Sequence, residues 1–230
     1  MREIILDTET TGLDPSQGHR IVEIGAVELF NHVATGETFH VYLNPDRDMP
    51  AEAEAVHGLS AAFLRDKPRF ETVADRFLAF ISDSVLIIHN ASFDVGFINA
   101  ELSYVRKPPL PPERVVDTLH LARQKHPAGP NSLDALCRRY GVDNTRRSKH
   151  GALLDAELLA EVYLELIGGR QTALSLSTAK PSRVMAASRG QTVQPRLVPL
   201  APRLTLQERE AHQVFVEKLG THALWRELES

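Results

Sequence analysis

The amino-acid sequence predicts an α/β fold in which helices pack against a mixed sheet, followed by a tail of different composition. Three strand patterns come first, before any helical pattern. From about residue 50 to 167, short apolar strands then alternate with longer helical stretches. Early strands followed by mixed helices and strands indicate a mixed sheet with helices on it. The change of composition after residue 167 separates this domain from the tail.

The predicted elements follow one another along the chain. Strand patterns cover REIILD (2–7), RIVEIGAVELF (20–30), GETFHVYLN (36–44), VLIIH (85–89) and VVDT (115–118). The first reads as a short buried strand, and period-two alternation marks the second and third. Helical stretches are expected at 51–56, 70–81, 91–105, 119–125, 131–140 and 150–167.

Composition places the chain among globular proteins and excludes several other classes. It has 230 residues, 43% of them hydrophobic and 24% charged, so wholesale disorder is excluded. The apolar runs are too short to cross a membrane, and the N-terminus does not read as a signal peptide. The lone Cys137 cannot form an internal disulfide, which favours a reducing cytoplasm. The net charge of −4 argues against a protein that holds long duplex DNA by phosphate neutralisation alone.

The tail divides into a linker and a short helical segment. Residues 166–207 contain six basic residues and no acidic residue, and prolines recur among Ser, Thr and Gln. Such a composition buries little apolar surface, so 168–203 is predicted to be a flexible basic linker. Thr205 and Glu208 form a capping-box pattern that opens a helix, and Gly220 is expected to close it. The segment 204–230 is therefore an amphipathic appendage that needs a surface to dock on.

Four carboxylates lie where the pattern predicts burial. Asp7 ends the first apolar strand and Glu9 follows two residues later, on the same face if the strand continues. Asp94 and Asp155 each have apolar residues at i+3 and i+4 on a predicted helix. Taken singly, each acid also fits an ordinary strand end or helix turn. Gathered together, they would need a cation to compensate their charge.

The residue types favour a hard cation. No Cys or His cluster has zinc spacing, so oxygen ligands for Mg²⁺ or Mn²⁺ are the better interpretation. Two such ions can activate water and stabilise the leaving oxygen of a phosphodiester. His150 stands five residues before Asp155, at the start of the last predicted helix, where it could take a proton from that water. An exposed histidine next to Lys149 is the ordinary alternative.

Three motifs together resemble the DnaQ-like 3′→5′ exonucleases of the DEDDh group. They are DTETTG from Asp7, HNASFD from His89, and HGALLDA from His150. Their order, their contexts and the His-x4-Asp spacing all agree with that family. The resemblance covers the chain to about Leu166 and implies a ribonuclease H-like fold with a mixed five-stranded sheet, residues 1–167 forming the exonuclease domain.

The resemblance assigns roles to individual residues. It implies that two divalent cations, Mg²⁺ or Mn²⁺, are held by Asp7, Glu9, Asp94 and Asp155, and that His150 is the general base. The segment AEAEAVHG also resembles the family and would place Glu52 and His57 on the terminal nucleotide, together with Asp7, Glu9 and Asp155. Glu54 is a rival for the position of Glu52, and an exposed helix turn is the alternative for both. Gly12 would permit close contact with the terminal sugar.

The tail points to the proofreading branch of the family, the exonuclease subunits of bacterial DNA polymerase III. Gln171–Leu176 resembles a sliding-clamp motif, and 204–230, with Trp225, resembles the segment that binds the polymerase alpha subunit. A helix that folds back on its own domain is the alternative. The resemblance also allows a small theta-like subunit. The domain through Glu165 carries 17 basic and 25 acidic residues, so it is expected to hold free DNA poorly. A tether to the polymerase would instead supply a high effective concentration of the DNA 3′ end.

The resulting hypothesis is a proofreading 3′→5′ exodeoxyribonuclease that releases 5′-mononucleotides from single-stranded or frayed DNA ends. Its expected location is the cytoplasm, in the replisome at the bacterial nucleoid. A free-standing DEDDh ribonuclease that trims RNA 3′ ends would use the same site residues and is the nearest alternative. A scaffold without catalytic activity is the alternative from a different class, and the complete carboxylate set with His150 argues against it.

Overall fold

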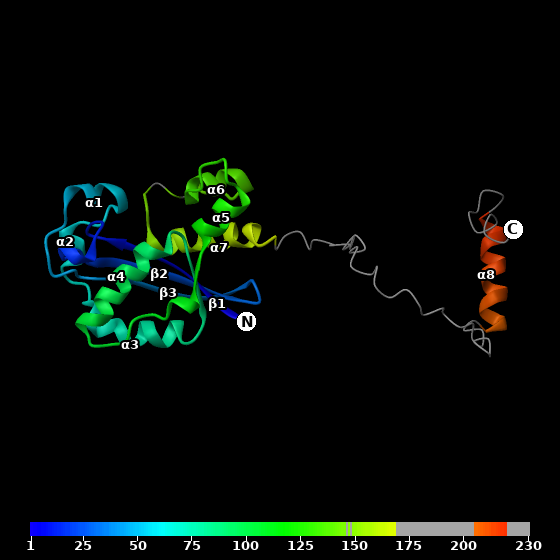
Figure 1. Cartoon of the computed structure of the whole chain (residues 1–230), viewed down its shortest axis with the longest axis horizontal. Coiled ribbons are helices and arrows are strands. Elements are labelled where there is room, and N and C mark those ends of the chain that lie inside the picture. Colours follow the sequence, from blue (N-terminus) through cyan, green and yellow to red (C-terminus); the bar gives the residue numbers. More distant parts are fainter. Residues whose placement is uncertain (146, 148, 169–204, 220–230) are drawn as a thin grey trace, which may run out of the picture. The chain divides into compact units, whose positions relative to one another are not determined.

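The computed structural model describes residues 1–145, 147, 149–168 and 205–219 (Figure 1). These residues belong to two separate units, the N-terminal domain and a single C-terminal helix. Of the predicted linker, Gly168 alone is among the described residues. The clamp-like segment Gln171–Leu176, Gly220 and Trp225 lie outside them.

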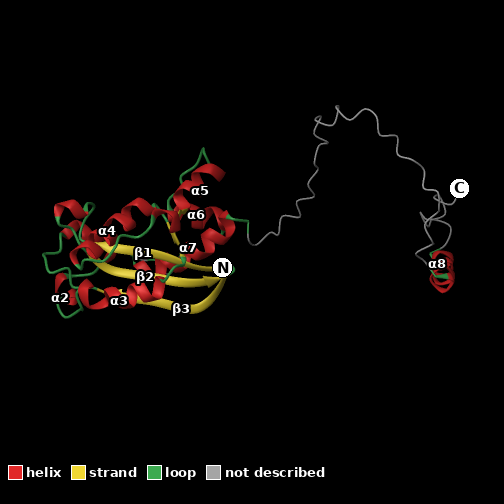
Figure 2. Ribbon diagram, turned by 60° about the horizontal axis from the view of Figure 1, so that its bottom comes forward, coloured by secondary structure: helices red, strands yellow, loops and turns green. Residues whose placement is uncertain are grey.

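A five-stranded mixed sheet forms the centre of the N-terminal domain (Figure 2). The first three strands pair antiparallel, and the last two run parallel to the first. The order across the sheet is β3-β2-β1-β4-β5, so the first strand of the chain lies in the middle. The strands are β1 (Arg2–Thr10), β2 (Ile21–Phe30), β3 (Val33–Tyr42), β4 (Val85–Ile88) and β5 (Val115–Asp117).

Helices cover both faces of this sheet. The α-helices of the domain are α1 (Ala51–His57), α2 (Ala61–Leu64), α3 (Phe70–Ile81), α4 (Ala91–Tyr104), α5 (Thr118–Lys125), α6 (Leu133–Tyr140) and α7 (Ala152–Leu166). Two short 3₁₀ turns, η1 (Pro15–Gln17) and η2 (Pro112–Arg114), begin with proline, which fits the first turn of a helix.

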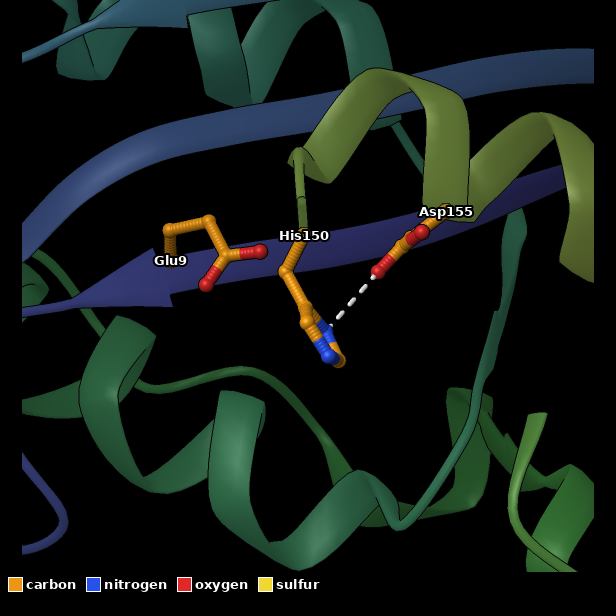
Figure 3. A group of neighbouring side chains, drawn as sticks. All are labelled: Glu9, His150 and Asp155. Atoms are coloured by element: carbon orange, nitrogen blue, oxygen red, sulfur yellow. Dashed lines mark ion pairs between the residues drawn. The ribbon is translucent and has the colours of Figure 1, made fainter. Parts of the chain in front are cut away.

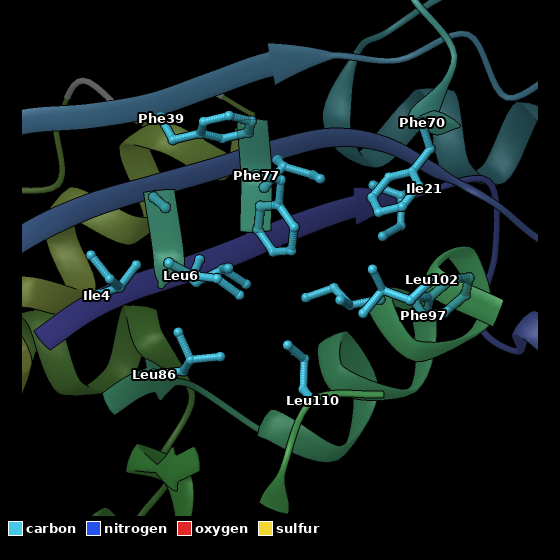
Figure 4. Packing of buried hydrophobic residues seen from close by; sticks show 14 of the residues in the cluster. Ile4, Leu6, Ile21, Phe39, Phe70, Phe77, Leu86, Phe97, Leu102 and Leu110 are labelled. Carbon is cyan, nitrogen blue, oxygen red and sulfur yellow. The ribbon is translucent and has the colours of Figure 1, made fainter. Parts of the chain in front are cut away.

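The alternation of side chains along β1 separates two apolar layers. Ile4 and Leu6 belong to the larger core, between the sheet and helices α3 and α4, where Phe77 and Phe97 are fully buried (Figure 4). Ile5 points the other way and packs with α7. A strand buried on both faces reads as a continuous apolar run, which explains the sequence of β1.

The predicted fold is confirmed, with differences at element ends. Strand β1 continues three residues past Asp7, and β3 begins three residues earlier than predicted. Helix α7 begins at Ala152, so His150 precedes the helix and does not start it. Helix α2 and the two 3₁₀ turns were not predicted, because one-turn elements contain too few residues to show a period.

The C-terminal unit is the helix α8 (Leu206–Lys218). The predicted capping box is present: the Thr205 hydroxyl accepts from the Glu208 N–H, and the Glu208 carboxylate accepts from the Thr205 N–H. Val214 and Phe215 are more than half exposed on this helix. Among the described residues, no helix has the length and apolar character needed to span a membrane.

Candidate active site

Strand β1 carries two of the predicted acids. Because the strand continues to Thr10, Asp7 and Glu9 lie two residues apart on one face, the face that packs against α7. Asp7 lies opposite Gly25 on β2, and Glu9 lies opposite Glu23. Glu9 is buried and Asp7 is half-buried. The predicted shared face of the two acids is therefore present.

Helix α4 brings Asp94 to the same end of β1. The backbone N–H of Thr8 donates to Asp94 Oδ1 at 3.0 Å, and the Thr8 hydroxyl donates to the same oxygen at 2.7 Å. Asp94 is 3% exposed and lies in the first turn of α4. These two hydrogen bonds tie the helix to the strand between the two β1 acids.

Gly25 allows the first turn of α7 to lie directly on the sheet. A Cβ placed at this glycine would be 2.1 Å from the Leu153 backbone nitrogen and 2.2 Å from the Ala152 carbonyl carbon. Because Gly25 is the β2 partner of Asp7, this contact sets the start of α7 beside that acid. Asp155, in the first turn of α7, is buried there.

The four predicted acids and His150 all line a single cleft of about 820 Å³, together with Asp134 and His89. Ligand atoms of Glu9, His150 and Asp155 lie within 4.8 Å of one another (Figure 3). His150 Nδ1 is 3.4 Å from Asp155 Oδ2, the pair joined by the dashed line in Figure 3. The His150 side chain is about half exposed, so solvent reaches it, whereas the carboxylates of Glu9 and Asp155 are buried. The structure thus brings all five predicted core residues together.

Crowding of carboxylates shifts their pKa values. Burial, and then the charge of Asp155, raises the pKa of Glu9 to about 8. Burial also raises the pKa of Asp94 to about 7, although the hydrogen bonds from Thr8 act in the opposite direction. The pKa of Asp7 lies well above its ordinary value because of burial and the charges of Asp94 and Glu9. The raised pKa values indicate that too little positive charge lies near these three carboxyl groups.

Asp155 differs from the other three acids. Burial alone would raise its pKa, but hydrogen bonds from His150 and Arg147, together with their charges, hold the pKa below its ordinary value. Arg147 makes a two-point contact: its Nε and Nη2 donate to the two Asp155 oxygens, each at 2.6 Å. Its Nη1 donates to Asp134 at 2.6 Å. His150 and this arginine together keep Asp155 ionised.

A second hollow of about 520 Å³ shares Thr8, Glu9 and Phe93 with the cleft. Glu52 and His57 both line it, whereas Glu54 does not, so the structure favours Glu52 over its rival. His57 is buried, and the Leu59 N–H donates to its Nδ1 at 3.0 Å. Burial lowers the pKa of His57.

At Gly12 the close neighbour in the structure is the His19 ring. A Cβ on Gly12 would be 2.3 Å from that ring, so a side chain at this position would displace it. The Thr11 hydroxyl lies 3.1 Å from His19 Nδ1, which further fixes the imidazole against the DTETTG segment.

Three polar residues of the site were missed by the sequence analysis. Arg147 and Asp134 face the cleft, and Glu23, which is buried, lies opposite Glu9 and pairs with His40 at 2.7 Å. Arg147 stands in the basic run Arg146–Lys149, which reads as an exposed loop. Glu23 could have been identified from its position in the middle of an apolar strand pattern, the same kind of signal that identified Asp7.

The donor set fits hard divalent cations. Carboxylate oxygens converge from β1, α4 and α7, and three of the four acids have raised pKa values, as expected for ligands without their cation. Asp7, Glu9, Asp94 and Asp155 are the residues that would hold such ions.

The raised pKa values predict how stability depends on pH. A carboxyl group whose pKa is higher in the folded state stabilises the fold when protonated and loses that contribution as the pH rises. With chelator present, we therefore expect the free energy of unfolding to fall between about pH 5 and pH 9. A divalent cation such as Mg²⁺ would bind the deprotonated form of carboxylate ligands, so its addition should reverse the fall. Thermal denaturation across this range, with EDTA and with Mg²⁺, measures both effects.

The matched variant for this measurement is Glu9→Gln. It removes the group whose pKa is raised to about 8, so its stability should fall less steeply with pH in chelator. Identical pH profiles for the variant and the unaltered chain would contradict the assignment of the pH dependence to Glu9.

Comparison with known proteins agrees with this geometry. A family model described as exonuclease (RNase_T) matches residues 4–163. The DNA polymerase III subunit epsilon of Rickettsia prowazekii is 52% identical over 232 residues, covering 95% of this chain and 97% of that protein. The protein of the same name from Escherichia coli K12 is 44% identical over 241 residues, covering 98% and 97%.

A solved structure also matches the domain. Exonuclease X in complex with 5′ overhanging duplex DNA is 28% identical, with a TM-score of 0.59, and the match covers 73% of this chain and 92% of that chain. The resemblance drawn from the three motifs is confirmed, and the family depends on divalent metal ions. The chain therefore belongs to the exonuclease family, within the group of DNA polymerase III epsilon subunits.

Proposed function

We propose that this chain is a proofreading 3′→5′ exodeoxyribonuclease of the bacterial replicative polymerase, with its active site in the cleft between β1, α4 and α7. The observation that carries the proposal is the convergence of Asp7, Glu9, Asp94, Asp155 and His150 in that cleft. Four acids with a neighbouring histidine provide ligands for two cations and one proton acceptor. That set supports phosphodiester hydrolysis and argues against a scaffold without activity.

The roles of the residues follow from their positions. Asp7, Glu9, Asp94 and Asp155 would hold two divalent ions, Mg²⁺ or Mn²⁺. When bound, such ions would make a coordinated water more acidic and would offset negative charge on the leaving 3′ oxygen. His150, the exposed member of the group, takes the proton of the attacking water.

The neighbouring hollow suits the terminal nucleotide. It opens beside Glu9 and is lined by Glu52, His57 and Phe93. The aromatic ring offers a stacking surface. The Glu52 carboxylate can accept a hydrogen bond from a sugar hydroxyl, and His57 can donate one through Nε2, since its Nδ1 accepts from Leu59. A base fits there more readily when it is unpaired, so frayed and mismatched ends are preferred.

The remaining partner assignments concern the tail. Gln171–Leu176 binds the sliding clamp, and 204–230 binds the polymerase alpha subunit. The exposed Val214 and Phe215 of α8 support this second assignment, because an apolar helix face is stabilised by a partner. A theta-like subunit completes the assembly, which works at the replisome in the cytoplasm. The relatives that match nearly the whole chain are named as polymerase subunits, which argues against the RNA-trimming alternative.

The experiment that tests the activity uses 5′-labelled single-stranded DNA and an RNA of the same sequence. With Mg²⁺ we expect a ladder that shortens from the 3′ end of the DNA and is faint on the RNA. With chelator we expect no cleavage of either strand. Cleavage mainly of the RNA would contradict the proofreading assignment and favour the trimming enzyme.

A truncation separates the catalytic and partner assignments. We expect residues 1–167 alone to keep the metal-dependent nuclease activity, because all five core residues lie within them. The truncated chain should no longer co-purify with the polymerase alpha subunit, whereas the full chain should. Equal recovery of alpha with both chains would contradict the role assigned to 204–230.

A further inference from the structure

Arg147 enters the carboxylate cluster from the loop before α7. Only 7% of its side chain is exposed. Its Nε and Nη2 donate to the two oxygens of Asp155, and its Nη1 donates to Asp134 Oδ1. Nη2 also lies 2.7 Å from His150 Nδ1. One guanidinium thus contacts a predicted metal ligand and the predicted base at once.

The contact with Asp155 places a positive charge where the cluster needs one. A guanidinium at 2.6 Å from both oxygens satisfies that carboxylate in the geometry that Arg–carboxylate pairs prefer. Its charge also lowers the raised pKa values of Asp7 and Glu9. A divalent ion at Asp155 would therefore meet an arginine already bound there, and the two cations would repel each other.

The contact with His150 has a second consequence. His150 Nδ1 lies 2.7 Å from Arg147 Nη2, closer than the 3.4 Å that separates it from Asp155 Oδ2. The guanidinium therefore covers one ring nitrogen of the predicted base while it is bound to Asp155.

We infer that Arg147 is a positioning residue that occupies Asp155 and contacts His150 in the metal-free site, and that releases both when divalent ions bind. Asp134, whose side chain is about half exposed at the cleft, stays paired with the guanidinium after that release. Arg147 then no longer contacts Asp155, which can bind the metal ion, or His150, which can contact the water. This inference rests on the proposed role of Asp155 as a metal ligand.

Titration of the full chain with Mn²⁺ by calorimetry tests the competition. Arg147→Met removes the competing charge, so we expect it to bind Mn²⁺ about tenfold more tightly than the unaltered chain. Arg123→Met is the matched control, because Arg123 lines the same cleft and its loss changes the charge equally. The control should bind Mn²⁺ less than about threefold more tightly. Equal or weaker binding by a folded Arg147→Met chain would overturn the inference.

Nitrogen NMR of the Arg147 guanidinium gives a readout that needs neither activity nor a variant. We expect its Nε resonance to shift on addition of Mg²⁺, because the contact between Nε and Asp155 is released. An unchanged Nε resonance at saturating Mg²⁺ would overturn the inference even if Arg147→Met failed to fold. Absence of Mn²⁺ binding by the unaltered chain would contradict the proposed metal site itself, which distinguishes the two failures.

Discussion

Replacing Asp7 by asparagine is expected to lower turnover by about a thousandfold or more without unfolding the domain. Asp7 lines the cleft, and the charges of Asp94, Glu9 and Asp155 all act on it. The change keeps the shape of the side chain but removes the charge proposed to bind the cations. Because burial and neighbouring acids raise the pKa of Asp7, a neutral side chain should leave the metal-free fold as stable or more stable.

Single-turnover cleavage of labelled DNA with saturating Mg²⁺ measures the loss, and thermal denaturation in chelator measures the stability. Asp75→Asn is the matched control, since that aspartate is 85% exposed and pairs with Lys107 at the surface. It should keep full activity. More than a tenth of normal turnover in Asp7→Asn would refute the assignment of Asp7 as a metal ligand.

Replacing Gly25 by alanine is expected to reduce activity by about a hundredfold although Gly25 touches no substrate. The added Cβ would start 2.1 Å from the α7 backbone, and an ordinary contact requires at least 3.4 Å. Helix α7 must therefore move outward and take Asp155 and His150 with it. Displacements of about 1 Å in a catalytic group are enough to cause losses of this size.

The control for Gly25→Ala is the same substitution at Gly96, in the helix that carries Asp94. A Cβ there meets nothing within 4 Å, and alanine favours the helix. Gly96→Ala should keep full activity and gain about 0.5–1 kcal/mol of stability. Turnover and thermal midpoints of the two variants, measured side by side, separate the position of α7 from a general effect of losing a glycine. Normal activity in Gly25→Ala would show that α7 tolerates displacement.

Local patterns predict most of the architecture. The apolar runs identify all five strands, and the 3.6-residue period gives α3 its observed ends, Phe70 and Ile81. The family resemblance supplied the mixed five-stranded sheet, whereas the strand order depends on tertiary pairing and was not predicted. Asp7, Glu9, Asp94 and Asp155 could be singled out because a carboxylate is costly to bury and stands out against apolar neighbours, and His150 by its place five residues before Asp155.

Other features are invisible to a local pattern. The need for glycine at position 25 arises from a helix that lies 127 residues later in the chain, at Ala152. Arg147 is one of several basic residues in a polar loop, and only the folded domain shows that its side chain is buried. Both depend on tertiary contacts that the preceding and following residues do not encode.

The placement of the site on β1 and α7 has a consequence for how the protein is made. Strand β1 is the first element of the domain and α7 the last, and the site needs side chains from both. More than 140 residues must therefore be synthesised after Asp7 and Glu9 before Asp155 is added to the nascent chain. On the proposed assignment, nuclease activity requires helix α7 to dock on the sheet. A nascent chain that ends before α7 therefore cannot assemble this site.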